Sequence, residues 1–209
     1  MPSRAKKTAH VAKQDQPDIL KRHRDWFAAQ HDLDPNRLVC IDETWASTKA
    51  STNMAPRHGR CRPGQCLRAL VPHGHWKTTT FIAGLRRSGM VAPMVLDGPI
   101  NLIAFEAYVE QVPVPELSPG DIVVMDNLDS HQGPQVRSLI EAVGAGLLLL
   151  PPYTDFNPIE NAFSKLKAHL RKAAERNLEG LWGAIGRIAD LFTSRDCQNF
   201  FEAAGYDPM

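Results

Sequence analysis

The chain has 209 residues, of which 43% are hydrophobic and 22% are charged, and its net charge at pH 7 is +1. These values are typical of one globular domain with a short extension, and they exclude an intrinsically disordered chain. No apolar run approaches the roughly 18 residues of a membrane span, and the basic N-terminus lacks the apolar segment of a secretory signal. Four cysteines are too few for a disulfide framework, so we expect a protein of the reducing cytoplasm.

Strand and helix patterns follow one another along the whole chain. In chain order, the expected elements are a basic tail over 1–16, a helix over 17–30, strands over 38–41, 67–71, 76–85 and 90–96, a helix over 102–112, a strand over 121–125, a helix over 135–143, a strand over 147–150, and helices from 157, from 178 and before Gly205. Closely spaced early strands favour antiparallel hairpins, and later strands that alternate with helices favour parallel crossovers. The sequence therefore predicts an α/β domain over 36–209 with a mixed sheet flanked by helices, preceded over 1–35 by a tail or linker and the short helix.

Basic residues are concentrated in one stretch of this near-neutral chain. Between Thr44 and Leu96 there is no Asp or Glu, whereas eight Lys or Arg residues occur there. Such an excess is typical of a surface that binds a polyanion, and Arg57, Arg60 and Arg62 are candidate DNA contacts. A basic face that is merely solvated explains the charge equally well.

Three acidic residues occupy positions that suit a metal site. Asp42 and Asp126 each follow an apolar run of the buried-strand type, and Glu160 stands in the first turn of a helix after the next strand. Strand ends of a buried sheet are rigid and open onto a crevice. Three carboxylates on separate rigid elements can bind two hard divalent cations, with phosphate and water completing the coordination.

Each acid also has a purely structural interpretation. Asp126 with Asn127 could form a turn after the strand, and Asp42 with Glu43 could be an exposed or capping pair. Glu160 comes three residues after Asn157, which is the spacing of a capping box. The joint pattern of the three acids is what favours the metal site.

Four motifs surround these acids: IDETW at 41–45, VMDN at 124–127 followed by Ser130-His131, PPY at 151–153, and NPIE at 157–160. Together they closely resemble the catalytic motifs of bacterial insertion-sequence transposases of the mariner superfamily. The resemblance extends from about Leu38 to the C-terminus. It implies a ribonuclease H-like fold, with a mixed five-stranded sheet flanked by helices.

The resemblance also implies an activity and its partners. It implies a DDE catalytic domain that cleaves and transfers DNA strands at insertion-sequence ends with two Mg²⁺ or Mn²⁺ ions, held by Asp42, Asp126 and Glu160. The implied partners are the terminal inverted repeats, target DNA and a second copy of the chain, at the bacterial nucleoid. Asn127 and Asn157 are expected near this site.

Two further residues have more than one interpretation. His131 could contact phosphate or water near the site, or could be a surface histidine at a helix start. Lys167 lies seven residues after Glu160, so it shares roughly the same helix face and could touch the DNA backbone, whereas Lys165 points elsewhere.

The sequence departs from the family in its spacing and its N-terminus. It has one residue fewer than usual between the PPY and the NPIE, which leaves 160 − 126 − 1 = 33 residues between the last two acids. The family's N-terminal helix-turn-helix domain is not recognisable, and the chain begins in what resembles the linker. The alternative function is therefore a truncated or decayed transposase that binds DNA or a full-length partner without catalysis.

Overall fold

The computed structural model describes residues 16–47, 78–128, 131, 133–152, 156–173, 175 and 177–206. Its elements are α1 (Pro17–Gln30), β1 (Leu38–Ser47), β2 (Thr78–Arg86), β3 (Gly89–Asp97), α2 (Leu102–Gln111), the 3₁₀ turn η3 (Val114–Glu116), β4 (Ile122–Met125), α3 (Pro134–Ala142), β5 (Gly146–Leu149), α4 (Pro158–Ala173), α5 (Leu178–Ala189) and α6 (Ser194–Ala203). The helices and most strands agree with the sequence prediction to within a few residues. The expected strand at 67–71 and the candidate DNA contacts Arg57, Arg60 and Arg62 lie outside the described residues.

The five strands form one mixed sheet in the order β3-β2-β1-β4-β5. β1 pairs antiparallel with β2 and β2 antiparallel with β3, whereas β1–β4 and β4–β5 are parallel. Two residues connect β2 to β3, which suits a hairpin, and helices α2 and α3 supply the crossovers into β4 and β5. The prediction of a mixed sheet with early hairpins and later crossovers is confirmed.

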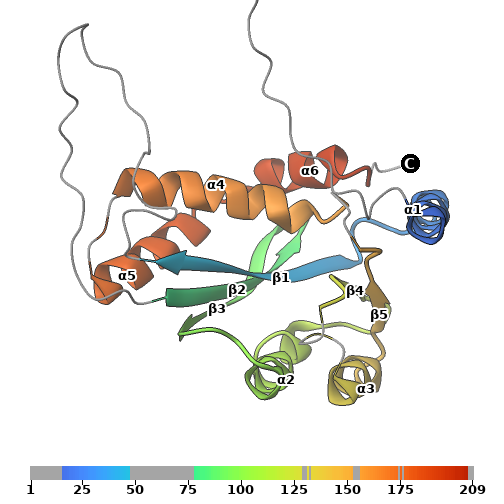
Figure 1. Ribbon diagram of the computed structural model, residues 1–209, viewed down its shortest axis with the longest axis horizontal. Helices are drawn as coiled ribbons and strands as arrows, with labels where there is room; N and C mark the ends of the chain where they lie inside the picture. Colours follow the sequence, from blue (N-terminus) through green and yellow to red (C-terminus); the bar gives the residue numbers. More distant parts are fainter. Residues whose placement is uncertain are drawn as a thin grey trace, which may run out of the picture.

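Helices cover both faces of the sheet (Figure 1). Helices α4, α5 and α6 lie over one face, and α2 and α3 lie over the other. Side chains along β1 alternate between the two layers, since Leu38 and Cys40 pack under α4–α6 while Val39 and Ile41 pack against α2 and α3. None of the helices described is both long enough and apolar enough to cross a membrane.

Strand β1 does not end at Asp42, contrary to the sequence prediction. It continues to Ser47 because β2 remains its antiparallel partner, from Asp42 opposite Ala83 to Ser47 opposite Thr78. The parallel partner β4 is the strand that stops, at Met125. The apolar run in the sequence ends at Ile41 because β4 flanks only the first part of β1, with pairing that ends at Cys40.

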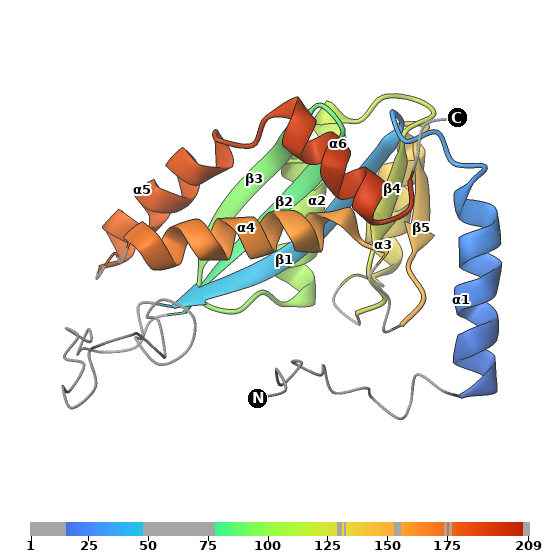
Figure 2. The same ribbon diagram turned by 90° about the horizontal axis from the view of Figure 1, so that it is seen from above.

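Helix α1 lies beside the β5 edge of the sheet (Figure 2). Gln30, which is 2% exposed, donates a hydrogen bond from Nε2 to the carbonyl of Ala204 at 2.7 Å. His23 Nε2 donates to the carbonyl of Pro152 at 2.8 Å. The helix is thereby attached both to the end of α6 and to the segment that leads into α4.

Candidate active site

The pairing of β1 with β4 brings Asp42 and Asp126 side by side. Cys40 is the register partner of Val124, so two residues further along the parallel strands come Asp42 and Asp126. The alternation that places Cys40 and Val124 under α4 places both aspartates on this same side of the sheet. Two carboxylates separated by 83 residues in the sequence (126 − 42 − 1) are thus close in space.

Helix α4 brings Glu160 to the same side. A cavity of about 320 Å³ is lined by Asp42, Glu43, Thr44, Glu160, Phe163, Ser164 and Lys167. At the start of the helix, Asn157 is 2% exposed and its Nδ2 donates to Asp42 Oδ2 at 3.4 Å. Its Oδ1 accepts from the backbone N–H of Ile159 at 3.4 Å, the geometry of a capping asparagine. Asn157 therefore joins the first turn of α4 to the first aspartate.

The three acids do not form a compact cluster around a single point. Among the described residues, no group of three or more His, Cys, Asp or Glu side chains is close enough to hold one metal ion. Asp42 is instead adjacent to Asp126 through the sheet and shares the cavity with Glu160. This arrangement offers two carboxylate pairs with Asp42 in common.

Charge and burial strongly perturb Asp42. Burial, followed by repulsion from Asp126, raises the pKa of this carboxyl to about 8, although the backbone N–H of Glu43 donates to Oδ1 at 2.7 Å and favours ionisation. A partly buried carboxyl that faces a second carboxylate is costly to ionise unless positive charge is supplied. The site therefore has the electrostatic character of a cation-binding centre.

This perturbed carboxyl predicts how stability depends on pH. The pKa of Asp42 is higher in the folded protein than in the unfolded chain, so the protonated carboxyl favours the folded state at low pH. This contribution to stability is lost as the pH rises from the unfolded-state pKa of Asp toward about 8. In EDTA, we therefore expect the free energy of unfolding to fall between pH 5 and pH 8. Asp42→Asn should remove most of this slope and be more stable than wild type at pH 8 by roughly 1–3 kcal/mol. Urea titrations at pH 5 and pH 8 measure the free energy of unfolding of both proteins. A wild-type protein that is equally stable at the two pH values would contradict the prediction.

His131 is buried between β1 and the residue that follows β4, rather than being a surface histidine or a phosphate contact. Its side chain is fully buried, and Nε2 is hydrogen-bonded to Glu43 Oε2 at 2.7 Å, whereas Nδ1 lies 2.5 Å from Asp126 Oδ1 as an ion-pair contact without hydrogen-bond alignment. Burial lowers the pKa of the imidazole, but the two carboxylates outweigh it and raise the pKa to about 9. The contact of His131 with Glu43 was missed by the sequence analysis. Strand alternation was the available signal, because it places Glu43 on the face opposite Asp42.

The two lysines of α4 differ as predicted. Lys167 lines the cavity with Asp42 and Glu160; burial lowers the pKa of its amine, while these two carboxylates act in the opposite direction. Lys165 points away and forms an ion pair with Asp196 of α6 at 2.8 Å. Of these two lysines, Lys167 is therefore the one that could contact a molecule bound in the cavity beside Asp42 and Glu160.

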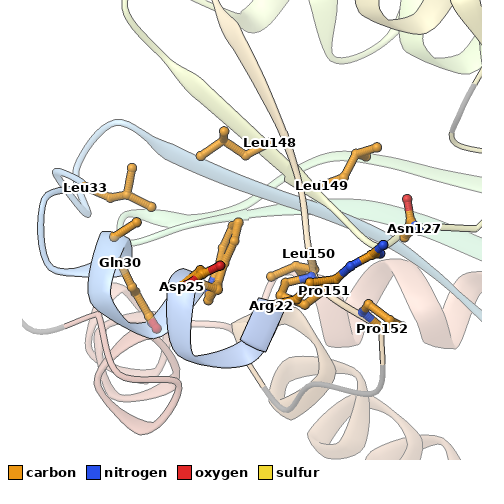
Figure 3. Close-up of a pocket in the computed structure, with 12 residues that line it drawn as sticks. Arg22, Asp25, Gln30, Leu33, Asn127, Leu148, Leu149, Leu150, Pro151 and Pro152 are labelled. Carbon is orange, nitrogen blue, oxygen red and sulfur yellow. The ribbon is translucent and has the colours of Figure 1, made fainter. Parts of the chain in front are cut away.

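Asn127 opens onto a larger, separate cavity (Figure 3). This cavity, of about 510 Å³, lies between α1 and the end of β5, and its lining includes Arg22, Trp26 and Pro152. Arg22 extends from α1 toward Asn127 in Figure 3. The lining does not include Asp42, Asp126 or Glu160, so the larger cavity is not the place where the acids meet.

Comparisons with known proteins give one family match for the chain. The model of the DDE superfamily endonuclease family matches residues 37–181, more than half of the chain. No curated protein sequence matches the chain significantly.

Solved structures of the Mos1 mariner transposase have the same fold. The Mos1 strand transfer complex superposes with a TM-score of 0.77 at 16% identity, covering 98% of this chain and 63% of that one. The Mos1 paired end complex with Mg gives 0.75 at 19% identity, covering 98% and 65%. The Mos1 catalytic domain alone gives 0.65 at 14% identity, covering 94% and 91%. The ribonuclease H-like fold is thus confirmed, and the chain spans less than two thirds of the first Mos1 chains.

Proposed function

Because the chain belongs to the DDE superfamily endonuclease family, we propose that it is the catalytic domain of a mariner-type transposase, which cleaves and joins DNA strands with divalent metal ions. The observation that supports this most directly is the alignment of Asp42 with Asp126 on the face of the sheet covered by α4, the helix that bears Glu160. These are the residues proposed to bind metal and to be catalytic.

The donor set fits two Mg²⁺ or Mn²⁺ ions. Both are hard cations that prefer carboxylate oxygens, and Mg²⁺ commonly uses one or two protein carboxylates together with water and substrate phosphates. We assign one ion to Asp42 with Asp126 and the other to Asp42 with Glu160. Structures of Mos1 with Mg and with Mn support the choice of metal. Bound there, the ions would activate water or a 3′-hydroxyl and stabilise the leaving oxygen.

The protein's own residues hold this arrangement in place. Asp42 is paired with β2 inside the sheet, Asp126 follows directly on the last residue of β4, and Asn157 ties the first turn of α4 to Asp42. Lys167 supplies a positive charge at the cavity wall, where a scissile phosphate would add negative charge. Fixed positions of this kind matter because displacement of a catalytic group by about 1 Å can cost about 10²-fold in rate.

DNA is the proposed substrate, in the form of insertion-sequence ends and a target. The Mos1 neighbours include strand transfer and paired end complexes, which support strand transfer between paired ends by a dimer. The basic stretch between Thr44 and Leu96 is the proposed backbone contact.

The test is cleavage of DNA by the whole chain. With Mn²⁺ or Mg²⁺, we expect nicking of a supercoiled plasmid that carries the element's terminal inverted repeats, and no nicking in EDTA or with Asp126→Ala. Equal nicking by wild type and Asp126→Ala would reject the site. Salt-sensitive DNA binding with no metal-dependent nicking would favour the alternative, a fragment that binds DNA without catalysis.

A further inference from the structure

We propose that Glu43 and His131 form a positioning relay that holds the Asp126 carboxylate in the orientation needed to bind its cation, and that Glu43 is not itself a metal ligand. This inference rests on the proposed function, because it concerns the same site. It assigns different roles to two adjacent acids of β1: Asp42 binds metal, and Glu43 positions another ligand. Residue type alone cannot distinguish these roles.

The contacts form a continuous chain from β1 to the residue that directly follows β4. Glu43 Oε2 lies 2.7 Å from His131 Nε2, and His131 Nδ1 lies 2.5 Å from Asp126 Oδ1. The backbone N–H of Leu128 also donates to Oδ1 of Asp126, at 3.2 Å. These contacts engage Oδ1, and Oδ2 is the oxygen with which we propose that Asp126 binds a cation.

The imidazole is held too tightly to be a mobile contact for substrate. It is fully buried, and its ring lies against Phe105 of α2 with the centroids 4.2 Å apart and the planes at 31°. Both ring nitrogens face carboxylates, so neither is available to a phosphate. A buried side chain with one partner on β1 and another directly after β4 holds these two partners in a fixed relation.

Strand alternation explains why Glu43 contacts His131 rather than lying beside Asp42. Asp42 faces the α4 side of the sheet, and its neighbour Glu43 projects to the other side, where α2 and His131 lie. Glu43 also lines the cavity that contains Asp42 and Glu160, so direct coordination is the competing interpretation. Residues behind a metal ligand that orient it commonly change metal affinity by about 10- to 100-fold when replaced.

Two amide substitutions of His131 test the relay because each can keep only one of its contacts. In His131→Asn, the amide takes the place of Nδ1 and can still contact Asp126. In His131→Gln, the amide takes the place of Nε2 and can reach only Glu43. We expect Mn²⁺ affinity, measured by calorimetry without DNA, to fall about tenfold in His131→Gln and in Glu43→Gln. His131→Asn should stay closer to wild type.

The double variant Glu43→Gln/His131→Gln separates a relay from direct coordination. The effects of substitutions are not additive when the residues act through the same path. We therefore expect the double variant to bind Mn²⁺ no more weakly than His131→Gln alone. Additive losses would show that Glu43 is itself a ligand and would overturn the inference, as would wild-type affinity in every variant. Glu110→Gln neutralises an exposed acid of α2 and serves as the matched control. Circular dichroism of each variant confirms that it is folded.

A second measurement needs no metal and keeps the inference distinct from the proposed function. ¹⁵N–¹H spectra of the metal-free protein should show a ring N–H proton of His131 that is protected from exchange with water, and Glu43→Gln should reduce this protection. Fast exchange of this proton in wild type would overturn the relay. Failure of the wild type to bind Mn²⁺ would instead overturn the proposed function.

Discussion

Replacing Asp42 by Asn should abolish metal-dependent DNA cleavage while leaving the fold intact. Asp42 is the acid common to both carboxylate pairs, so its loss should weaken both ions at once. We expect the cleavage rate to fall by at least about 10³-fold, because stabilisation of transition-state charge is commonly the largest contribution to catalysis. Single-turnover nicking with saturating enzyme measures the rate without interference from DNA binding.

The stability of the same variant provides an internal check. Asn cannot ionise, so it avoids the cost that burial and Asp126 impose on the Asp42 carboxylate, and the metal-free variant should be at least as stable as wild type at pH 8. Asp32→Asn, which neutralises an exposed acid in the turn after α1, is the control and should cleave DNA like wild type. Retention of most of the cleavage rate by Asp42→Asn would reject its role.

Replacing Glu160 by Gln should also abolish cleavage, and it separates catalysis from helix capping. Gln at the third position of a helix caps it as Glu does, so the free energy of unfolding should change by less than about 0.5 kcal/mol. A neutral amide binds a divalent cation far less well than a carboxylate, so the cleavage rate should fall by at least about 10²-fold. Nicking assays and urea titrations on the same preparation measure both quantities.

Glu179→Gln is the matched control for Glu160→Gln. Glu179 lies in the first turn of α5, whose N-terminal cap is Asn177, so this substitution neutralises an acid in a similar helical position away from the site. It should leave cleavage unchanged. If Glu160→Gln cleaved DNA as well as wild type and Glu160→Ala only lowered stability, Glu160 would be a capping residue, and the chain would fit the non-catalytic alternative.

The sequence predicted the elements well where periodicity and caps agree. Helix α2 begins after Asn101, whose side chain accepts from the N–H of Ala104, and β4 follows the apolar run 122–125. Strand β1 was predicted too short because its second half alternates between buried and exposed residues along β2. The local sequence pattern cannot show that β1 keeps β2 as its partner on one edge after β4 has ended on the other edge.

The chemistry of the site was predicted less completely than its location. Asp42 and Asp126 were recognisable because each follows an apolar strand, and each lies two residues beyond the register partners Cys40 and Val124. The bridge from Glu43 to His131 was not predicted, because 87 residues (131 − 43 − 1) separate the two and only the tertiary fold brings them together. The roles of Arg57, Arg60 and Arg62 stay a prediction, since they lie outside the described residues.

Crystals soaked in Mn²⁺ test the central proposal most directly, because anomalous scattering locates the ions without reference to activity. We expect one anomalous peak between Asp42 and Asp126 and, with DNA bound, a second between Asp42 and Glu160. Manganese–oxygen distances should be close to those of hard divalent cations, about 2.0–2.3 Å. Mn²⁺ bound elsewhere, or coordinated by Glu43 in place of Asp126, would contradict the account.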